Sequence, residues 1–200
     1  MTSVYFIRHG HVSNPTGIIY GPDTSLSTDG RRQVELLAAY LKTAGLQPAN
    51  ILSSPYERTR QTTDIIRLHF PGVPISFDER LREWQVGTWT NQPLADFYAA
   101  TGYDRDANTR LPPGIESIES CAKRIHEVVE EAVREHADQT VFIVSHREPL
   151  AAAILKYQNK DWSTIHDLEL PFASAWHMTF DQADTPPIVR PIFSAPAVGT

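Results

Sequence analysis

The stretch Val4-Tyr5-Phe6-Ile7-Arg8-His9-Gly10 decides the fold class of this 200-residue chain. Four apolar, β-prone residues that end at a glycine predict a short buried strand, with an arginine and a histidine at its carboxyl end. Open α/β sheets bind their ligands at this end of their strands. Arginine offers a planar fork of donors that suits phosphate, and a neutral histidine can act as a nucleophile. The stretch therefore predicts a strand-end site, although an arginine and a histidine that face solvent would leave the same pattern.

Three further segments carry residues with the same chemical potential. The apolar pair Ile51-Leu52 precedes Ser53-Ser54-Pro55-Tyr56-Glu57-Arg58, and the β-branched run 141–144 ends at Ser145-His146. Between them, residues 83–89 read Glu-x-x-x-Gly-x-Trp. Two of these segments begin where a predicted strand ends, so we expect them at one edge of a parallel sheet.

Strand and helix patterns alternate along the chain. The helical patterns begin at Ser27, at about residue 56, near 93, at Ser117 and at Pro149, and the additional strands are expected at 74–77, 173–181 and 188–194. This alternation predicts an α/β fold, a three-layer sandwich with a mostly parallel central sheet flanked by helices, in which the last two strands are antiparallel. We expect residues 1–200 to form a single domain, with a lid-like insertion at about 84–116.

Composition limits the kinds of partner. The 41% hydrophobic and 21% charged residues are ordinary for a globular domain, and the net charge of −6 argues against binding to nucleic acid. A small anionic molecule needs only local positive charge, so it is still a possible ligand. The single cysteine, Cys121, cannot form an intramolecular disulfide, and no signal-peptide or membrane-spanning pattern is visible. We therefore expect a cytoplasmic protein that does not contact a membrane.

Taken together, the four motifs resemble those of the histidine phosphatase superfamily, also called the phosphoglycerate mutase-like family. The resemblance runs from the first strand to His146 and implies a helix-flanked sheet, in agreement with the pattern above. It implies that His9 is the nucleophile and forms a phosphohistidine. It also implies that Arg8 and Arg58 clamp the phosphate and that His146 provides a further phosphate contact.

The same resemblance gives Glu83 the role of the acid that protonates the leaving oxygen and then activates water. A carboxyl group can do this near neutral pH only if burial or negative charge raises its pKa. The alternative is a plain salt bridge from Glu83 to Arg80 or Arg82. No metal is expected, because arginines can neutralise the phosphate and the eight histidines show no ligand cluster.

Three more residues are candidates for contact with the substrate. The resemblance implies that His11 helps line the pocket and that Asn14 contacts phosphate, although Asn14 is equally well explained as a turn residue. The stretch Arg147-Glu148-Pro149 departs from the small residues that many relatives have after the second histidine. It narrows the pocket, or Arg147 adds a cation for a second acidic group, or Glu148 simply pairs with Arg147.

Three functions remain open at this point. The first is a metal-independent phosphatase that hydrolyses a small-molecule phosphomonoester. The second is a 2,3-bisphosphoglycerate-dependent mutase, and the third is a phosphate-binding regulatory domain with low activity. Between Trp89 and Ser117 the only cations are Arg105 and Arg110, set among acidic residues, which favours hydrolysis over binding of a bisphosphate. The sequence leaves the substrate open, as it does the choice between a monomer and a homodimer.

Overall fold

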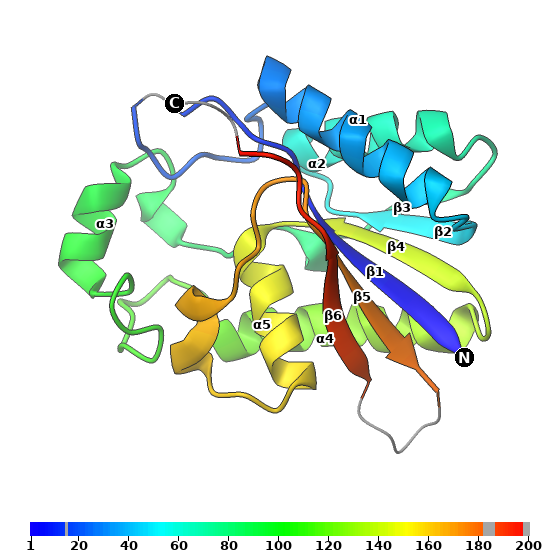
Figure 1. The fold of residues 1–200 in the computed structure, drawn as a ribbon. Helices are drawn as coiled ribbons and strands as arrows, with labels where there is room; N and C mark the ends of the chain where they lie inside the picture. Colours follow the sequence, from blue (N-terminus) through cyan, green and yellow to red (C-terminus); the bar gives the residue numbers. More distant parts are fainter. Residues whose placement is uncertain (15, 182–186, 198–200) are drawn as a thin grey trace.

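The central sheet of the computed structural model, which describes residues 1–14, 16–181 and 187–197, is mostly parallel. The strand order is β3-β2-β4-β1-β5-β6 (Figure 1). The pairs β3–β2, β2–β4 and β4–β1 are parallel, and β5 and β6 are antiparallel, as the sequence predicts. The strands are β1 (Thr2–Arg8), β2 (Pro48–Ser53), β3 (Ile75–Phe77), β4 (Thr140–Ser145), β5 (Ala175–Phe180) and β6 (Ile188–Phe193).

Helices cover both faces of the sheet and complete the three layers (Figure 1). One face carries α1 (Thr28–Thr43) and α2 (Glu57–His69), and the other carries α4 (Ile118–Glu135) and α5 (Arg147–Tyr157). Successive residues of β1 alternate between the two cores: Val4 and Phe6 pack on the α4–α5 side, and Tyr5 and Ile7 on the α1–α2 side. A strand that is buried on both faces needs a continuous apolar run, which explains the opening stretch of the sequence.

The helix starts follow from capping chemistry. The Ser27 hydroxyl accepts a hydrogen bond from the Gly30 amide at 3.0 Å, and Ser117 caps α4 in the same way. Helix α5 begins at Arg147, two residues before the predicted start at Pro149. A proline fits within the first turn because amides there have no partner inside the helix.

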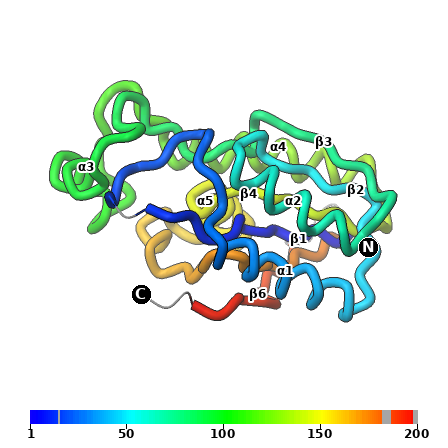
Figure 2. Tube along the Cα trace, turned by 90° about the horizontal axis from the view of Figure 1, so that it is seen from above, coloured from blue at the N-terminus to red at the C-terminus, as the bar shows by residue number. Residues whose placement is uncertain are grey.

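The segment 84–116 lies at the end of the molecule toward which β1 and β4 run (Figures 1 and 2). It holds the 3-10 turn η2 (Gly87–Trp89) and helix α3 (Leu94–Thr101), and it follows the 3-10 turn η1 (Glu79–Leu81). Its aromatic residues Trp84, Phe97 and Tyr103 are buried in the α4–α5 core. The insertion therefore sits over the ligand-binding edge of the sheet, and its action as a lid stays a prediction.

A further 3-10 segment, η3 (Trp162–Asp167), has no counterpart in the sequence-based prediction, because its short polar stretch shows no apolar periodicity. Among the helices of the described ranges, none has the length and apolar character needed to cross a membrane.

Candidate active site

Parallel pairing of β2, β4 and β1 brings three segments of the chain to one edge of the sheet. The register pairs Arg8 with Ser145, so that His9 and His146 follow neighbouring strands, and their ring centroids lie 5.3 Å apart. On the other side of β4, the Ser54 amide donates to the Val144 carbonyl at 2.9 Å. The convergence that the motifs predict is therefore present, and sheet topology produces it.

The neighbour of His9 fixes the protonation of its ring. His9 Nδ1 lies 2.8 Å from the Gly10 carbonyl oxygen, which can only accept a hydrogen bond. Nδ1 therefore carries the ring proton, and the lone pair is on Nε2. Gly10 is needed here because a Cβ at this position would lie 2.4 Å from the Gly30 carbonyl oxygen. The missing side chain thus lets α1 pack against the loop that orients the imidazole.

Arg58 contacts the Nε2 lone pair from the first turn of α2. Its Nε donates to His9 Nε2 at 3.3 Å, and its Nη1 donates to the Gly21 carbonyl at 2.9 Å. The side chain is completely buried, and Nη2 has no hydrogen-bond partner among the described residues. A buried guanidinium with a free donor is suited to an oxyanion beside His9.

The electrostatics keep the imidazole of His9 neutral. Burial lowers its pKa well below the usual value, and the charges of Arg58 and Arg8 lower it further. The pKa of His146 is lowered in the same direction, first by burial and then by Arg58. A neutral imidazole with a directed lone pair is competent as a nucleophile at neutral pH.

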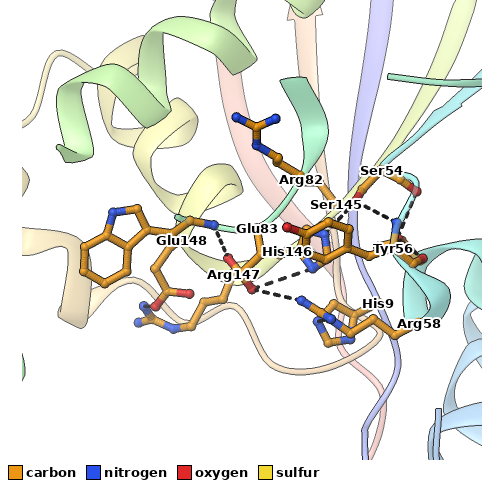
Figure 3. Close-up of polar contacts among 12 residues, drawn as sticks. His9, Ser54, Tyr56, Arg58, Arg82, Glu83, Ser145, His146, Arg147 and Glu148 are labelled. Carbon is orange, nitrogen blue, oxygen red and sulfur yellow. Dashed lines mark hydrogen bonds and ion pairs between the residues drawn. The ribbon is translucent and has the colours of Figure 1, made fainter. Parts of the chain in front are cut away.

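Ser54 sets the opposite tautomer in His146. The Ser54 Oγ lies 2.8 Å from His146 Nε2 and accepts a hydrogen bond from the Tyr56 amide at 3.4 Å. No other acceptor for the Ser54 hydroxyl proton is found in the described part of the chain, so this hydroxyl donates to Nε2. The ring proton of His146 is then on Nδ1, which is buried, lacks a hydrogen-bond partner in the described ranges and lies 3.6 Å from Glu83 Oε2 (Figure 3).

Glu83 faces both the histidine and the arginine (Figure 3). Its Oε1 accepts from the Trp84 amide at 2.9 Å, and its Oε2 lies 3.8 Å from Arg58 Nη2. Burial raises the pKa of this carboxyl to about 7, with a further contribution from Glu148 that Arg58 opposes. Glu83 is therefore a carboxyl group that can give or take a proton near neutral pH.

The alternative explanation of Glu83 as a salt-bridge partner of Arg80 or Arg82 is wrong. Arg80 pairs with Glu131 at 2.6 Å and also binds Asp78. Arg82 approaches Glu79 at 3.9 Å. Both guanidinium groups thus have other carboxylate partners, which leaves Glu83 directed at the site.

Arg124 positions Glu83, a role that the motifs did not reveal. From α4 it donates to the carbonyls of Arg82 at 2.7 Å and Glu83 at 3.2 Å. It also binds Glu116 through Nε at 2.7 Å and Nη2 at 2.9 Å. Glu116, the residue before the Ser117 cap of α4, thus gives its carboxylate to Arg124. A charged residue beside the apolar stripe of α4 is the sequence signal that could have identified it.

The structure places the three substrate-binding candidates near the first loop in different environments. Arg8 and Asn14 line the cavity described below, and Arg8 Nη1 donates to the Leu170 carbonyl. The Asn14 amide makes two hydrogen bonds with the backbone of Ile18, so it also orders its own loop, as a turn residue would. The ring of His11 contacts the start of α1, where its Nδ1 lies 2.8 Å from Ser27 Oγ, and its contact with a substrate stays a prediction.

Arg147 and Glu148 form an ion pair at the first turn of α5. Arg147 Nη1 lies 3.1 Å from Glu148 Oε1, and Nη2 donates to the Ile165 carbonyl at 3.3 Å. Of the interpretations that the sequence left open, pairing within the chain is the one found here.

A cavity of about 200 Å³ lies next to the histidine–arginine cluster, between the first loop, the insertion and the start of α5. Arg8 and Glu83 connect its wall to the candidate site, and the ion pair of Arg147 and Glu148 also lines it. The rest of the wall is aromatic or aliphatic, with Ile18, Ile19, Tyr20, Trp84, Val86, Leu94, Phe97, Tyr98 and Tyr103. The cavity wall thus combines a few charged groups with a largely apolar surface.

The donor set also decides between an anion and a metal ion as the ligand. Potential ligand atoms of His9, Glu83 and His146 lie within 4.8 Å of one another. However, Arg58 donates to the same Nε2 of His9, and its charge lowers the pKa of both histidines. A cation would meet this guanidinium, whereas an oxyanion would satisfy its free donor. The cluster therefore fits an anion better.

Comparison with known proteins agrees with this geometry. The model of the histidine phosphatase superfamily (branch 1) matches residues 4–189. The chain belongs to the histidine phosphatase superfamily. It is 28% identical over 198 residues to a probable phosphoglycerate mutase, GpmB, of Yersinia pestis (strain Pestoides F), in a match that covers 88% of this chain and 90% of that one.

The solved structures that are similar to this chain include phosphatases. A mycobacterial glucosyl-3-phosphoglycerate phosphatase in complex with VO3 is 25% identical, with a TM-score of 0.81 and coverage of 97% of this chain and 99% of that one. The phosphoserine phosphatase of Entamoeba histolytica, in a structure with phosphoserine, has a TM-score of 0.80 at 21% identity and covers 94% and 95% of the two chains. The latter likeness concerns the fold alone.

Proposed function

We propose that this protein is a phosphatase that hydrolyses a small-molecule phosphomonoester without a metal ion, through a phosphohistidine on His9. The observation that carries the proposal is the pairing of a directed His9 Nε2 lone pair with Arg58 at 3.3 Å. Membership of the superfamily and the phosphatases among its structural relatives support it.

The first step transfers the phosphoryl group to the protein. His9 Nε2 attacks phosphorus, and the bond to the leaving oxygen breaks as Glu83 gives that oxygen its proton. The guanidinium groups of Arg8 and Arg58 and the Nδ1–H of His146 stabilise the charge on the non-bridging oxygens. An alcohol leaves, and N-phosphohistidine remains with Glu83 as a carboxylate.

The second step restores the protein. Glu83, now ionised, takes a proton from water, and the water oxygen attacks phosphorus as the bond to His9 Nε2 breaks. Phosphate is released, and Glu83 is again protonated. A carboxyl group with a pKa of about 7 can serve in both steps at neutral pH.

Hydrolysis of p-nitrophenyl phosphate tests the proposal. We expect turnover that EDTA does not reduce, and an acid-labile phosphoenzyme that can be trapped by quenching. His9→Ala should lower the rate by roughly a thousandfold or more and abolish the trapped species, while His69→Ala, at a partly exposed histidine on α2, should leave both unchanged. Full activity of His9→Ala, or loss of wild-type activity in EDTA, would contradict the proposed mechanism.

A mutase is the second candidate because a relative is named a probable phosphoglycerate mutase. Interconversion of phosphoglycerates that depends on bisphosphoglycerate and outpaces hydrolysis would favour this candidate. The third candidate, a regulatory domain with little turnover, would bind phosphate but fail the trapping assay. A cytoplasmic location, the absence of a nucleic-acid or membrane partner, and a monomer or homodimer stay predictions.

A further inference from the structure

The wall of the cavity offers little free positive charge for a site that binds phosphate esters. Among the described residues that line the cavity, the cations are Arg8 and Arg147. The proposed function assigns Arg8 to the phosphate, so Arg147 is the cation available to a second acidic group of a substrate. That guanidinium is already bound by Glu148 at 3.1 Å and by the Ile165 carbonyl at 3.3 Å.

The ion pair also acts on two tyrosines of the cavity wall. Burial raises the pKa of Tyr98 and of Tyr103, and at both positions Glu148 raises it further by more than Arg147 lowers it. The negative charge of Glu148 thus outweighs the positive charge of Arg147 at both hydroxyl groups. Glu148 also contributes to the raised pKa of Glu83, so its negative charge acts across the cavity.

The remaining wall offers apolar contact and a buried hydroxyl group that is available for hydrogen bonding. Trp84, Phe97 and Tyr103 pack against one another, and the Trp84 and Tyr103 rings lie 4.4 Å apart between centroids. The Tyr103 hydroxyl is buried and has no partner within the described ranges. A neutral hydroxyl or carbonyl group on a bound molecule could satisfy this hydroxyl, whereas a carboxylate in the cavity would lie beside Glu148.

We propose that the phosphomonoester taken by this cavity is the ester of an uncharged, partly apolar alcohol, and that Glu148 determines this specificity by occupying Arg147. This inference rests on the proposed function and specifies its substrate class. A second anionic group lowers the affinity of a substrate in two ways, because it must compete with Glu148 for Arg147 and must lie next to a like charge. Esters that carry a carboxylate, such as phosphoglycerate and phosphoserine, are therefore expected to be poor ligands.

A matched pair of aryl phosphates isolates the effect of charge. The compounds 4-carbamoylphenyl phosphate and 4-carboxyphenyl phosphate have nearly the same size and differ by one negative charge. Their dissociation constants are measured by calorimetry on the His9→Ala variant, which cannot be phosphorylated at this position. We expect the amide to bind about tenfold or more tightly than the acid.

Variants in the same His9→Ala background assign the effect to the ion pair. Glu148→Gln keeps the shape and frees Arg147, so the acid should gain about tenfold in affinity while the amide changes little. The double change Arg147→Gln with Glu148→Gln should remove this gain. The control Glu127→Gln, an exposed residue on α4, should leave both dissociation constants unchanged.

The outcomes separate the two proposals. Equal or tighter binding of the acid by the otherwise native pocket, or no effect of Glu148→Gln on the ratio, would overturn the specificity proposal. Failure of the wild-type protein to hydrolyse either ester would overturn the proposed function instead, since the binding measurement does not depend on turnover. When the protein turns over, the kcat/KM ratio of the two esters is expected to follow the same order.

Discussion

The carboxylate of Glu83 lies 3.8 Å from the guanidinium of Arg58, and its pKa is nevertheless raised to about 7. A cation at this distance ordinarily lowers the pKa of a carboxyl group. Here burial outweighs the cation, and the negative charge of Glu148 acts in the same direction as burial. The pair thus places a weak acid and a permanent cation at the candidate active site. Cleavage of a phosphate ester needs the acid for the leaving oxygen and the cation for the phosphoryl oxygens.

The pH dependence of the rate follows from this balance. The kcat/KM for phenyl phosphate, a poor leaving group, is expected to fall above about pH 7 as Glu83 loses its proton. Glu148→Gln should move this alkaline limb to lower pH because it removes a charge that raises the pKa of Glu83. pH–rate profiles from pH 5 to 9 measure the alkaline limb of the wild type and of the variant. The same limb position in both proteins would contradict the effect of Glu148 on the pKa of Glu83.

The same shift predicts how pH affects stability. The folded pKa of about 7 exceeds the usual value of 4.5, so between these pH values the folded state binds more protons than the unfolded chain. The contribution of Glu83 to the free energy of unfolding therefore decreases as pH rises through this window. Glu83→Gln should stabilise the protein more at pH 8 than at pH 5, as measured by urea unfolding. An equal effect at both pH values would show that the carboxyl is not perturbed in the folded state.

The contact between Ser54 and His146 predicts a positioning role for the serine. Without the hydroxyl, Nε2 loses the donor that keeps it unprotonated, and Glu83 Oε2, 3.6 Å from Nδ1, is the polar neighbour that still favours the proton on Nδ1. The Nδ1–H donor to phosphate is then lost in part of the population. Ser54→Ala should lower kcat by about tenfold or more. Nitrogen NMR of the His146 ring should show a shift of the tautomer population.

Ser53 provides the matched control for this experiment. It is equally buried, and its hydroxyl bonds the Ser54 carbonyl at 3.0 Å without contacting His146. Ser53→Ala is expected to keep the kcat and the tautomer of the wild type. If Ser54→Ala retains both as well, the hydroxyl does not set the tautomer.

Arg124 is expected to matter for both stability and activity. Its removal in Arg124→Met leaves the partly buried carboxylate of Glu116 without its partner and costs about 3 kcal/mol of unfolding free energy. It also frees the backbone of Glu83, so kcat should fall. The control Arg134→Met lies on the same helix but is 69% exposed, and its effect should stay within about 0.5 kcal/mol. Equal urea midpoints for the two variants would contradict the role of Arg124.

Much of the fold could be predicted because its signals are local. The apolar runs at 4–7 and 141–144 must be buried on both sides, and the serines at 27 and 117 satisfy amides within their own helices. The start of α5 was misplaced by two residues, since a proline within the first turn does not mark which residue of that turn comes first.

The partners of long polar side chains were the harder part of the site. The ring of His11 binds the α1 cap, and the carboxylate of Glu116 binds Arg124. These contacts join residues from different elements, and each partner has several alternatives nearby. Sequence spacing could identify the residue types but not the choice among these partners.

The sequence by itself determined the alternation of strands and helices, the strand-end positions of His9 and His146, and the chemistry of the motifs. Tertiary structure decided the rest: that β4 lies between β2 and β1, that the Ser54 hydroxyl contacts one histidine, and that Glu148 occupies Arg147. The physical reason is the distance along the sequence over which each kind of interaction acts. Propensity and capping act over a few residues, whereas burial, proton positions and charge pairing depend on groups that only folding brings together.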